Sequence, residues 1–225
     1  LVVAYGHILP KEMLKIPKIM SMNIHFSLLP KYRGASPIQS AIINGDKKTG
    51  ISFMKIIEKM DAGEIIYKAN IKIDNEDTKK VLENKLTSLA ISKMDRVLNS
   101  LKKNDYKLIE QNENDASYCS KIVKEDSLVD FKDTSLDIFN KFRALEDWPG
   151  TSFIHNNKVI KIHDMYISSI KSKGNPGEIY QIDPSGIKIN TIDYMIVITN
   201  LQFPNKKIIS SQDAFNSYFD FFIKK

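Results

Sequence analysis

The chain has 225 residues and a mass of 25.7 kDa, so it can bury roughly 70% of its unfolded surface in one large domain or two modest ones. With 42% hydrophobic and 27% charged residues its composition is that of a globular protein, and no apolar run of about 18 residues indicates a membrane span. The net charge of +6 permits a polyanionic partner without forming a block of like charge, and the single Cys119 excludes an internal disulfide. A cytoplasmic protein is expected.

The first hundred residues alternate between strand-like and helix-like segments. Residues 1–6 form an apolar run that ends in glycine, as in a buried parallel strand, so the chain is expected to begin within a domain. Short helices are predicted over 10–16 and 37–44, the second with Ser36 as N-cap and Pro37 at its first position. Further strands are predicted over 22–27, 50–57 and 65–73.

A long amphipathic helix is predicted to follow, with Asp77 or Thr78 as its N-cap, because apolar residues recur at helical spacing as far as Leu101. Residues 104–117, rich in Asn, Asp and Glu, are predicted as a linker. Beyond this linker, a helix is expected over 135–145. Short strands separated by Pro and Gly turns, typical of a small barrel, are expected near 159–167, 177–182, 186–190 and 194–203.

Polar side chains gather on one face of the predicted strand 22–27. Side chains alternate across a strand, so Asn23, His25 and Ser27 share a face opposite three apolar residues. An amide and an imidazole placed together could bind an oxyanion, and a carboxylate such as Asp61 could orient the imidazole and relay a proton. This pattern predicts acyl transfer without a covalent intermediate. The alternative is that Asn23 and His25 only satisfy backbone groups and that Asp61-Ala62-Gly63 only marks a turn.

These residues belong to motifs that occur in the same order in the folate-dependent formyltransferases, which the chain resembles over nearly its whole length. In the first part the motifs are Val2-Val3-Ala4-Tyr5-Gly6-His7-Ile8-Leu9-Pro10, Asn23-Ile24-His25-Phe26-Ser27-Leu28-Leu29-Pro30, Arg33-Gly34-Ala35-Ser36-Pro37-Ile38-Gln39 and Met60-Asp61-Ala62-Gly63. In the second part they are Tyr118-Cys119-Ser120-Lys121-Ile122, Lys124-Glu125-Asp126, Arg143-Ala144-Leu145 and Trp148-Pro149-Gly150.

The resemblance implies a role for each matching residue. Asn23, His25 and Asp61 match the catalytic trio of the family, in which an amine attacks the formyl carbon of 10-formyltetrahydrofolate. No metal is implied. The folate would be bound by the loop Ser27, Leu28, Leu29 and Pro30 and by the backbone around His7, Ile8 and Leu9.

The resemblance also implies an α/β fold with two domains. Residues 1–103 would be the C-terminal part of a doubly wound, Rossmann-like catalytic domain, since the family normally begins with a further β-α-β-α half. Residues 118–225 would form an oligonucleotide-binding (OB-like) barrel that helps to hold initiator methionyl-tRNA. Arg33 is expected either to contact the anionic substrate or to form a structural salt bridge, and Lys206 and Lys207 are expected to contact tRNA phosphates. A monomer is expected.

Three alternatives to transfer onto initiator methionyl-tRNA stay open. The same chemistry could formylate an amino sugar of a nucleotide. Such an enzyme would have a different second domain, and the region of Trp148 and Pro149 with the barrel-like strands after it argues against this alternative. A stand-alone transformylase of purine synthesis would not need residues 118–225. An inactive, truncated RNA-binding relic would show no turnover even with an N-terminal half restored.

Overall fold

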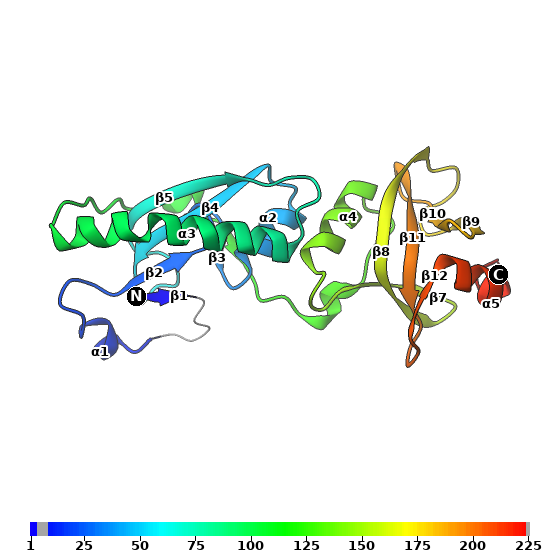
Figure 1. Ribbon diagram of the computed structural model, residues 1–225, viewed down its shortest axis with the longest axis horizontal. Helices are drawn as coiled ribbons and strands as arrows, with labels where there is room; N and C mark the ends of the chain where they lie inside the picture. Colours follow the sequence, from blue (N-terminus) through cyan, green and yellow to red (C-terminus); the bar gives the residue numbers. More distant parts are fainter. Residues whose placement is uncertain (4–8, 224–225) are drawn as a thin grey trace. The chain divides into compact units, whose positions relative to one another are not determined.

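The computed structural model describes residues 1–3 and 9–223 and divides the chain into two compact units, Leu1–Ile122 and Val123–Lys225 (Figure 1). The first unit contains, in chain order, β1 (Val2–Val3), α1 (Lys11–Leu14), β2 (Met22–His25), β3 (Arg33–Gly34), α2 (Pro37–Ile43), β4 (Lys48–Lys55), β5 (Ile65–Lys72), α3 (Lys79–Lys102), the 3₁₀ turn η1 (Glu113–Asp115) and β6 (Tyr118–Cys119).

The main sheet of this unit has the strand order β1-β2-β4-β5. β1 and β2 are parallel, whereas β4 runs antiparallel to both β2 and β5. The predicted α/β class is therefore confirmed for the first unit. The candidate catalytic strand β2 is an inner strand of the sheet, held on both sides by backbone hydrogen bonds, which fixes the direction of its side chains.

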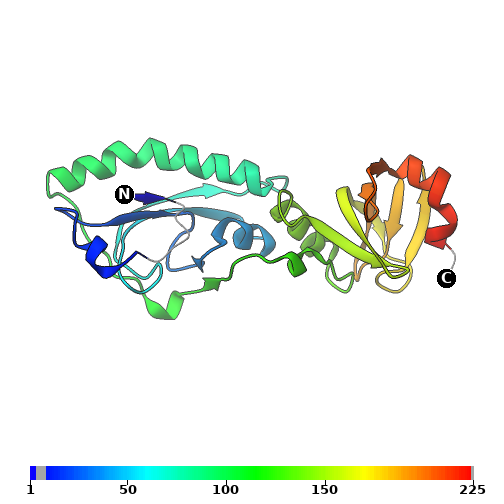
Figure 2. The ribbon, with the colours of Figure 1, turned by 90° about the horizontal axis from the view of Figure 1, so that it is seen from below.

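α3 lies along one face of this sheet (Figure 2). The Thr78 side chain caps the helix by accepting a hydrogen bond from the Val81 amide at 3.3 Å. This decides between the two predicted caps, since the Asp77 carboxylate instead accepts from the backbone amide of Asp74. The apolar stripe faces the sheet as its spacing predicts, with five buried residues, Leu82, Leu86, Ala90, Val97 and Leu101.

Residues 104–122, which include the predicted linker 104–117, belong to the first unit and pair with its earlier elements. Ile109 exchanges two backbone hydrogen bonds with Ile65, and β6 pairs in parallel with β3. Ser36 stands at the predicted N-cap of α2 but does not cap it, because its hydroxyl donates to the Ser120 carbonyl at 2.8 Å. The polar composition that favours a linker instead serves hydrogen bonds to this unit.

The second unit consists of an antiparallel sheet and two helices. Its elements are the 3₁₀ turn η2 (Lys124–Ser127), α4 (Ser135–Ala144), β7 (Thr151–His155), β8 (Lys158–Lys171), β9 (Ile179–Asp183), β10 (Gly186–Ile189), β11 (Tyr194–Gln202), β12 (Ile208–Ser210) and α5 (Ser211–Ile223). The strand order is β7-β8-β11-β10-β9, with β12 also paired to β11. Among the described residues no pairing joins β7 to β9, so the structure gives an open sheet where a barrel is predicted.

The core of the second unit lies between this sheet and its helices. Ile138 of α4, together with Ala214 and Phe222 of α5, packs against the buried isoleucines of β8, β10 and β11. The sequence predicts α4 and four of these strands. β7, β12 and α5 are absent from the prediction, although α5 supplies part of the core. No helix of the described chain is long and apolar enough to cross a bilayer.

Candidate active site

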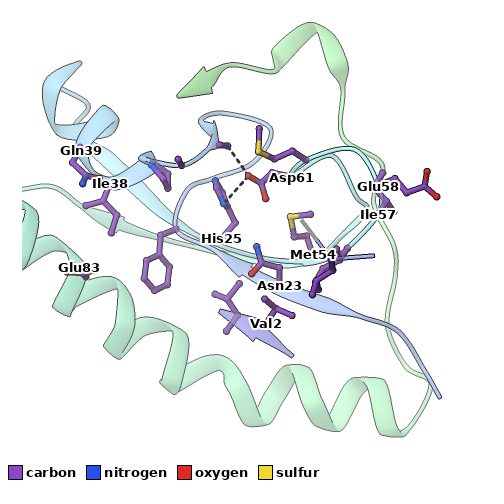
Figure 3. A pocket seen from close by; sticks show the side chains of 18 of the residues that line it. Val2, Asn23, His25, Ile38, Gln39, Met54, Ile57, Glu58, Asp61 and Glu83 are labelled. Carbon is purple, nitrogen blue, oxygen red and sulfur yellow. Dashed lines mark hydrogen bonds and ion pairs between the residues drawn. The ribbon is translucent and has the colours of Figure 1, made fainter. Parts of the chain in front are cut away.

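β2 brings two polar side chains to one pocket. Asn23 pairs in register with Val2 and Met54, and His25 pairs with Ser52, so both side chains lie on the same face, as the alternation predicts (Figure 3). The strand ends at His25. Ser27 therefore lies beyond the strand, and its hydroxyl donates to the Lys31 carbonyl at 2.6 Å.

His25 and Asp61 form the centre of the site. The His25 side chain is 6% exposed, and its Nδ1 lies 3.6 Å from Oδ2 of Asp61 (Figure 3). The other ring nitrogen, Nε2, donates to the Tyr32 carbonyl at 2.7 Å. Because a carbonyl oxygen only accepts, Nε2 carries a proton, which leaves Nδ1 to face the carboxylate. A second proton, on Nδ1, makes the imidazole cationic, and Asp61 then supplies the counter-charge.

Asp61 is held in a turn of unusual backbone conformation. Its φ of +50° lies in the left-handed region, which Asp tolerates better than most residues. Oδ2 accepts a hydrogen bond from the Gly34 amide at 2.8 Å. Within the described residues Oδ1 accepts no hydrogen bond, so one carboxylate oxygen is fixed and the other is open to a substrate proton.

Asn23 differs from its neighbours because its amide makes no hydrogen bond within the described part of the chain. It lies on the wall of a pocket of about 540 Å³ that also contains His25 and Asp61 (Figure 3). A half-buried amide without a protein partner contributes little to folding and remains available to a ligand. The Asn23 amide, the His25 imidazole and the Asp61 carboxylate thus line one pocket, and together they are suited to stabilising and deprotonating an acyl-transfer intermediate.

The predicted folate-binding residues divide into three groups. Leu9 lines the pocket, whereas His7 and Ile8 lie outside the described residues. Ser27 and Leu29 are fully buried and absent from the pocket lining, as are the half-buried Leu28 and Pro30. The loop is fixed from behind by Ser52, whose hydroxyl accepts from the Leu29 amide at 3.0 Å and donates to the Ser27 carbonyl at 2.7 Å. Sequence reasoning assigned no role in the site to the other pocket residues, namely Val2, Ile24, Phe26, Gly34, Ala35, Pro37, Ile38, Gln39, Met54, Ile56, Ile57, Glu58, Met60, Lys79 and Glu83.

Arg33 takes the structural alternative left open by the sequence. Its side chain is fully buried, and the guanidinium donates to Gln111, Glu113 and the Tyr118 hydroxyl at 2.8–3.2 Å. Arg33, followed by Lys59, lowers the pKa of Glu113 from 4.5 to about 2. These contacts favour the structural alternative for Arg33, whereas its contact with an anionic substrate stays a prediction.

Lys206 and Lys207 lie in the second unit, in the turn between β11 and β12, and both are exposed. The Lys206 ammonium donates to the Tyr218 hydroxyl at 2.9 Å and lies 5.3 Å from the centroid of the same ring. A phosphate contact by these two lysines stays a prediction.

Gly34 is expected to tolerate no side chain. Its φ is +118°, and a Cβ at this position would meet the Cys119 carbonyl oxygen at 2.2 Å. That oxygen is fixed because it accepts from the Ala35 amide. We expect Gly34→Ala to lower the free energy of unfolding by about 2–4 kcal/mol, measured by urea denaturation of the full chain.

Gly150→Ala is the matched control for this prediction. Gly150 also has a positive φ, of +78°, but no atom lies within 4 Å of an added Cβ. Its replacement should lower stability by only about 1 kcal/mol, from backbone strain alone. Equal losses in the two variants would contradict the collision with Cys119.

Comparison with known families agrees with this site. Residues 1–98 match the family model described as "Formyl transferase", and residues 121–218 match "Formyl transferase, C-terminal domain". The two matches cover most of the chain, and the first contains Asn23, His25 and Asp61. The fold and site thus define a formyl-transferring protein with an α/β first unit, and the chain belongs to the formyl transferase family.

Within this family the chain is similar to methionyl-tRNA formyltransferases. The relative from Finegoldia magna is 39% identical over 215 residues, which cover 96% of this chain and 69% of the relative. The relative from Sulfurihydrogenibium sp. is 38% identical over 218 residues, covering 96% and 70%.

Among solved structures, the chain resembles WlaRD, a sugar 3N-formyl transferase crystallised in the presence of dTDP and 5-N-formyl-THF. The TM-score is 0.71 at 27% sequence identity, and the match covers 91% of this chain and 72% of WlaRD. Within residues 1–3 and 9–223, no three His, Cys, Asp or Glu side chains are grouped as a metal site requires.

Proposed function

We propose that the protein transfers the formyl group of 10-formyltetrahydrofolate to the α-amino group of initiator methionyl-tRNA, the reaction that prepares the initiator for translation. The observation that carries this proposal is the His25–Asp61 pair beside the unpartnered Asn23 amide, in a chain whose relatives at 34–39% identity are methionyl-tRNA formyltransferases. The family membership supplies the reaction class, and the pocket supplies the groups that the reaction needs.

In the proposed reaction the amine nitrogen attacks the formyl carbon, and negative charge develops on the formyl oxygen. The Asn23 amide and the Nδ1–H of a protonated His25 donate hydrogen bonds to this oxygen. Asp61 balances the imidazolium and accepts the proton that the attacking nitrogen loses. The bond from the formyl carbon to N10 of the folate then breaks, and the proton passes to N10. The products are the N-formylated aminoacyl-tRNA and tetrahydrofolate.

The pocket also supports a folate as the formyl donor. Its volume of about 540 Å³ and its largely apolar lining, with polar groups such as Asn23, His25 and Asp61 converging on it, are typical of a small-molecule site. WlaRD, at 27% identity, was crystallised with a formylated folate. We place the reactive end of the donor against Asn23 and His25, with Leu9 along its ring system.

We further propose that the second unit binds the tRNA, as an OB-like domain would. Lys206 and Lys207, exposed beside β12, are the candidates for phosphate contacts. The alternative acceptor, an amino sugar of a nucleotide, is supported by WlaRD, but its identity of 27% is lower than the 39% shared with a methionyl-tRNA formyltransferase. The monomeric state and the cytoplasmic location stay predictions.

The proposal is tested by incubating the full-length protein with labelled 10-formyltetrahydrofolate and either charged initiator tRNA or a dTDP-amino sugar. We expect label in the tRNA fraction and none in the sugar fraction. Label in the sugar alone would establish the alternative acceptor, and label in neither, with a folded protein, would refute transfer to both acceptors.

A further inference from the structure

Gln111, in the segment predicted as a linker, contacts the turn that carries Asp61. Its side-chain amide nitrogen donates to the Asp61 carbonyl at 2.8 Å and to the Gly63 carbonyl at 2.7 Å. The two bonds clamp both ends of the Asp61-Ala62-Gly63 turn. No sequence motif marks this residue.

The orientation of the Gln111 amide is set by Arg33. The Gln111 oxygen accepts from Nε of Arg33 at 3.0 Å and from Nη2 at 2.8 Å. Because a guanidinium only donates, the oxygen must face Arg33 and the amide nitrogen must face the turn. Each hydrogen-bonding group of the Gln111 side chain is therefore used, and the buried Arg33 is held in turn by Glu113.

The same stretch of chain also holds the other groups of the site. Tyr32, Arg33 and Gly34 are consecutive, and each serves the catalytic pair: the Tyr32 carbonyl binds His25, the Arg33 guanidinium orients Gln111, and the Gly34 amide binds the Asp61 carboxylate. The backbone of this stretch is fixed by β6 and by Ser117, which accepts from the Arg33 amide at 2.8 Å. The backbone and the carboxylate of Asp61 are thus held by one connected network.

We infer that Gln111 is a positioning residue of this active site. It keeps Asp61 in its left-handed conformation and so holds the carboxylate at His25, without touching either substrate. Such a conformation persists only where the surrounding structure enforces it, and Gln111 supplies two hydrogen bonds directly to the strained turn. The inference rests on the proposed formyl transfer, because it takes the hydrogen-bond network around Asp61 to serve that reaction.

The test replaces Gln111 with methionine, which keeps the length of the side chain but cannot donate to the carbonyls. We expect kcat for formyl transfer to fall by about tenfold to hundredfold, since small displacements of a reacting group have effects of this size. The KM values for folate and tRNA should stay within about twofold, because Gln111 is not among the residues that line the pocket. Gln111→Asn, one methylene shorter, should not restore kcat.

Tyr118→Phe is the matched control. It removes one hydrogen bond from Arg33 and leaves the contacts of Gln111 intact, so stability falls slightly while kcat changes by no more than about twofold. An equal loss of kcat in both variants would overturn the inference, because the effect would then reflect a general loosening of the buried cluster. Unchanged kcat in Gln111→Met would overturn it as well.

A double-mutant cycle shows whether Gln111 acts through Asp61. In an Asp61→Asn background, Gln111→Met should lower the residual rate by less than about twofold, whereas a full additional loss would overturn the inference. If the wild-type protein transfers no formyl group, the proposed function fails separately. The inference is then judged by hydrogen exchange of amides 60–64, which must be faster in Gln111→Met than in Tyr118→Phe, and equal rates overturn it.

Discussion

Replacing His25 with alanine is expected to lower kcat for formyl transfer by about 10²–10⁴-fold, which is the usual contribution of a general acid or base. The imidazole lies next to Asp61 and lines the pocket, and alanine removes the oxyanion donor together with the proton relay. The fold should survive, because the change removes the hydrogen bond to the Tyr32 carbonyl and the contact with Asp61, at a cost of about 1–3 kcal/mol.

The measurement is single-turnover transfer of labelled formyl to charged initiator tRNA, with circular dichroism to check the fold. His163→Ala is the control, since this exposed histidine pairs with Gln202 of the second unit, at 3.0 Å, and should leave the rate near that of the wild type. A His25→Ala protein with an unchanged rate would remove His25 from the reaction and with it the proposed mechanism.

Asn23→Ala is expected to separate activity from stability. Removing one oxyanion donor lowers kcat by about 10²–10³-fold in comparable sites. The Asn23 amide has no hydrogen-bond partner among the described residues, so its loss should leave the free energy of unfolding unchanged or slightly raised. This combination is typical of a residue retained for function at no benefit to the fold.

Asn23→Asp gives a second, independent outcome. The carboxylate is nearly isosteric with the amide but repels the developing oxyanion, so kcat should fall at least as far as in Asn23→Ala, while the KM for folate changes less. Unfolding in urea and steady-state kinetics on the same preparations provide both quantities. A large loss of stability in Asn23→Ala would show that the amide serves the fold, which is the alternative left open by the sequence.

Local sequence patterns correctly predicted those features of the fold that are determined by residues close together in the chain. The spacing of apolar residues identified α3, and strand alternation placed Asn23 and His25 on one face, because both signals arise within a few turns or residues of the chain. α5 was missed even though a local signal exists. The Ser210 hydroxyl and the Asp213 carboxylate cap this helix reciprocally, which is the spacing of a capping box.

The environment of Asp61 and Arg33 could not be predicted in the same way. Arg33 bonds to Gln111 and Tyr118, which follow it by 78 and 85 residues, and no local pattern reports a contact over that separation. An arginine next to a predicted substrate-binding loop is expected at the surface, because arginine is mostly exposed in proteins. The guanidinium of Arg33 is instead buried, because residues from the end of the first unit cover it. The sequence offered Asp61 as a carboxylate that could orient His25, and the family resemblance supported this pairing, but the sequence between the two residues contains no signal of proximity.

The pairing of β3 with β6 has a consequence for synthesis on the ribosome. His25 and Asp61 emerge early, but the stretch that holds them, residues 32–34, is fixed only when Ser117 and Cys119 have left the exit tunnel. Because domains form as units while the chain is extended, Arg33 lacks its partners Gln111 and Tyr118 until the end of the first unit has emerged. Translation must therefore pass the whole polar segment after α3 before the active site can assemble.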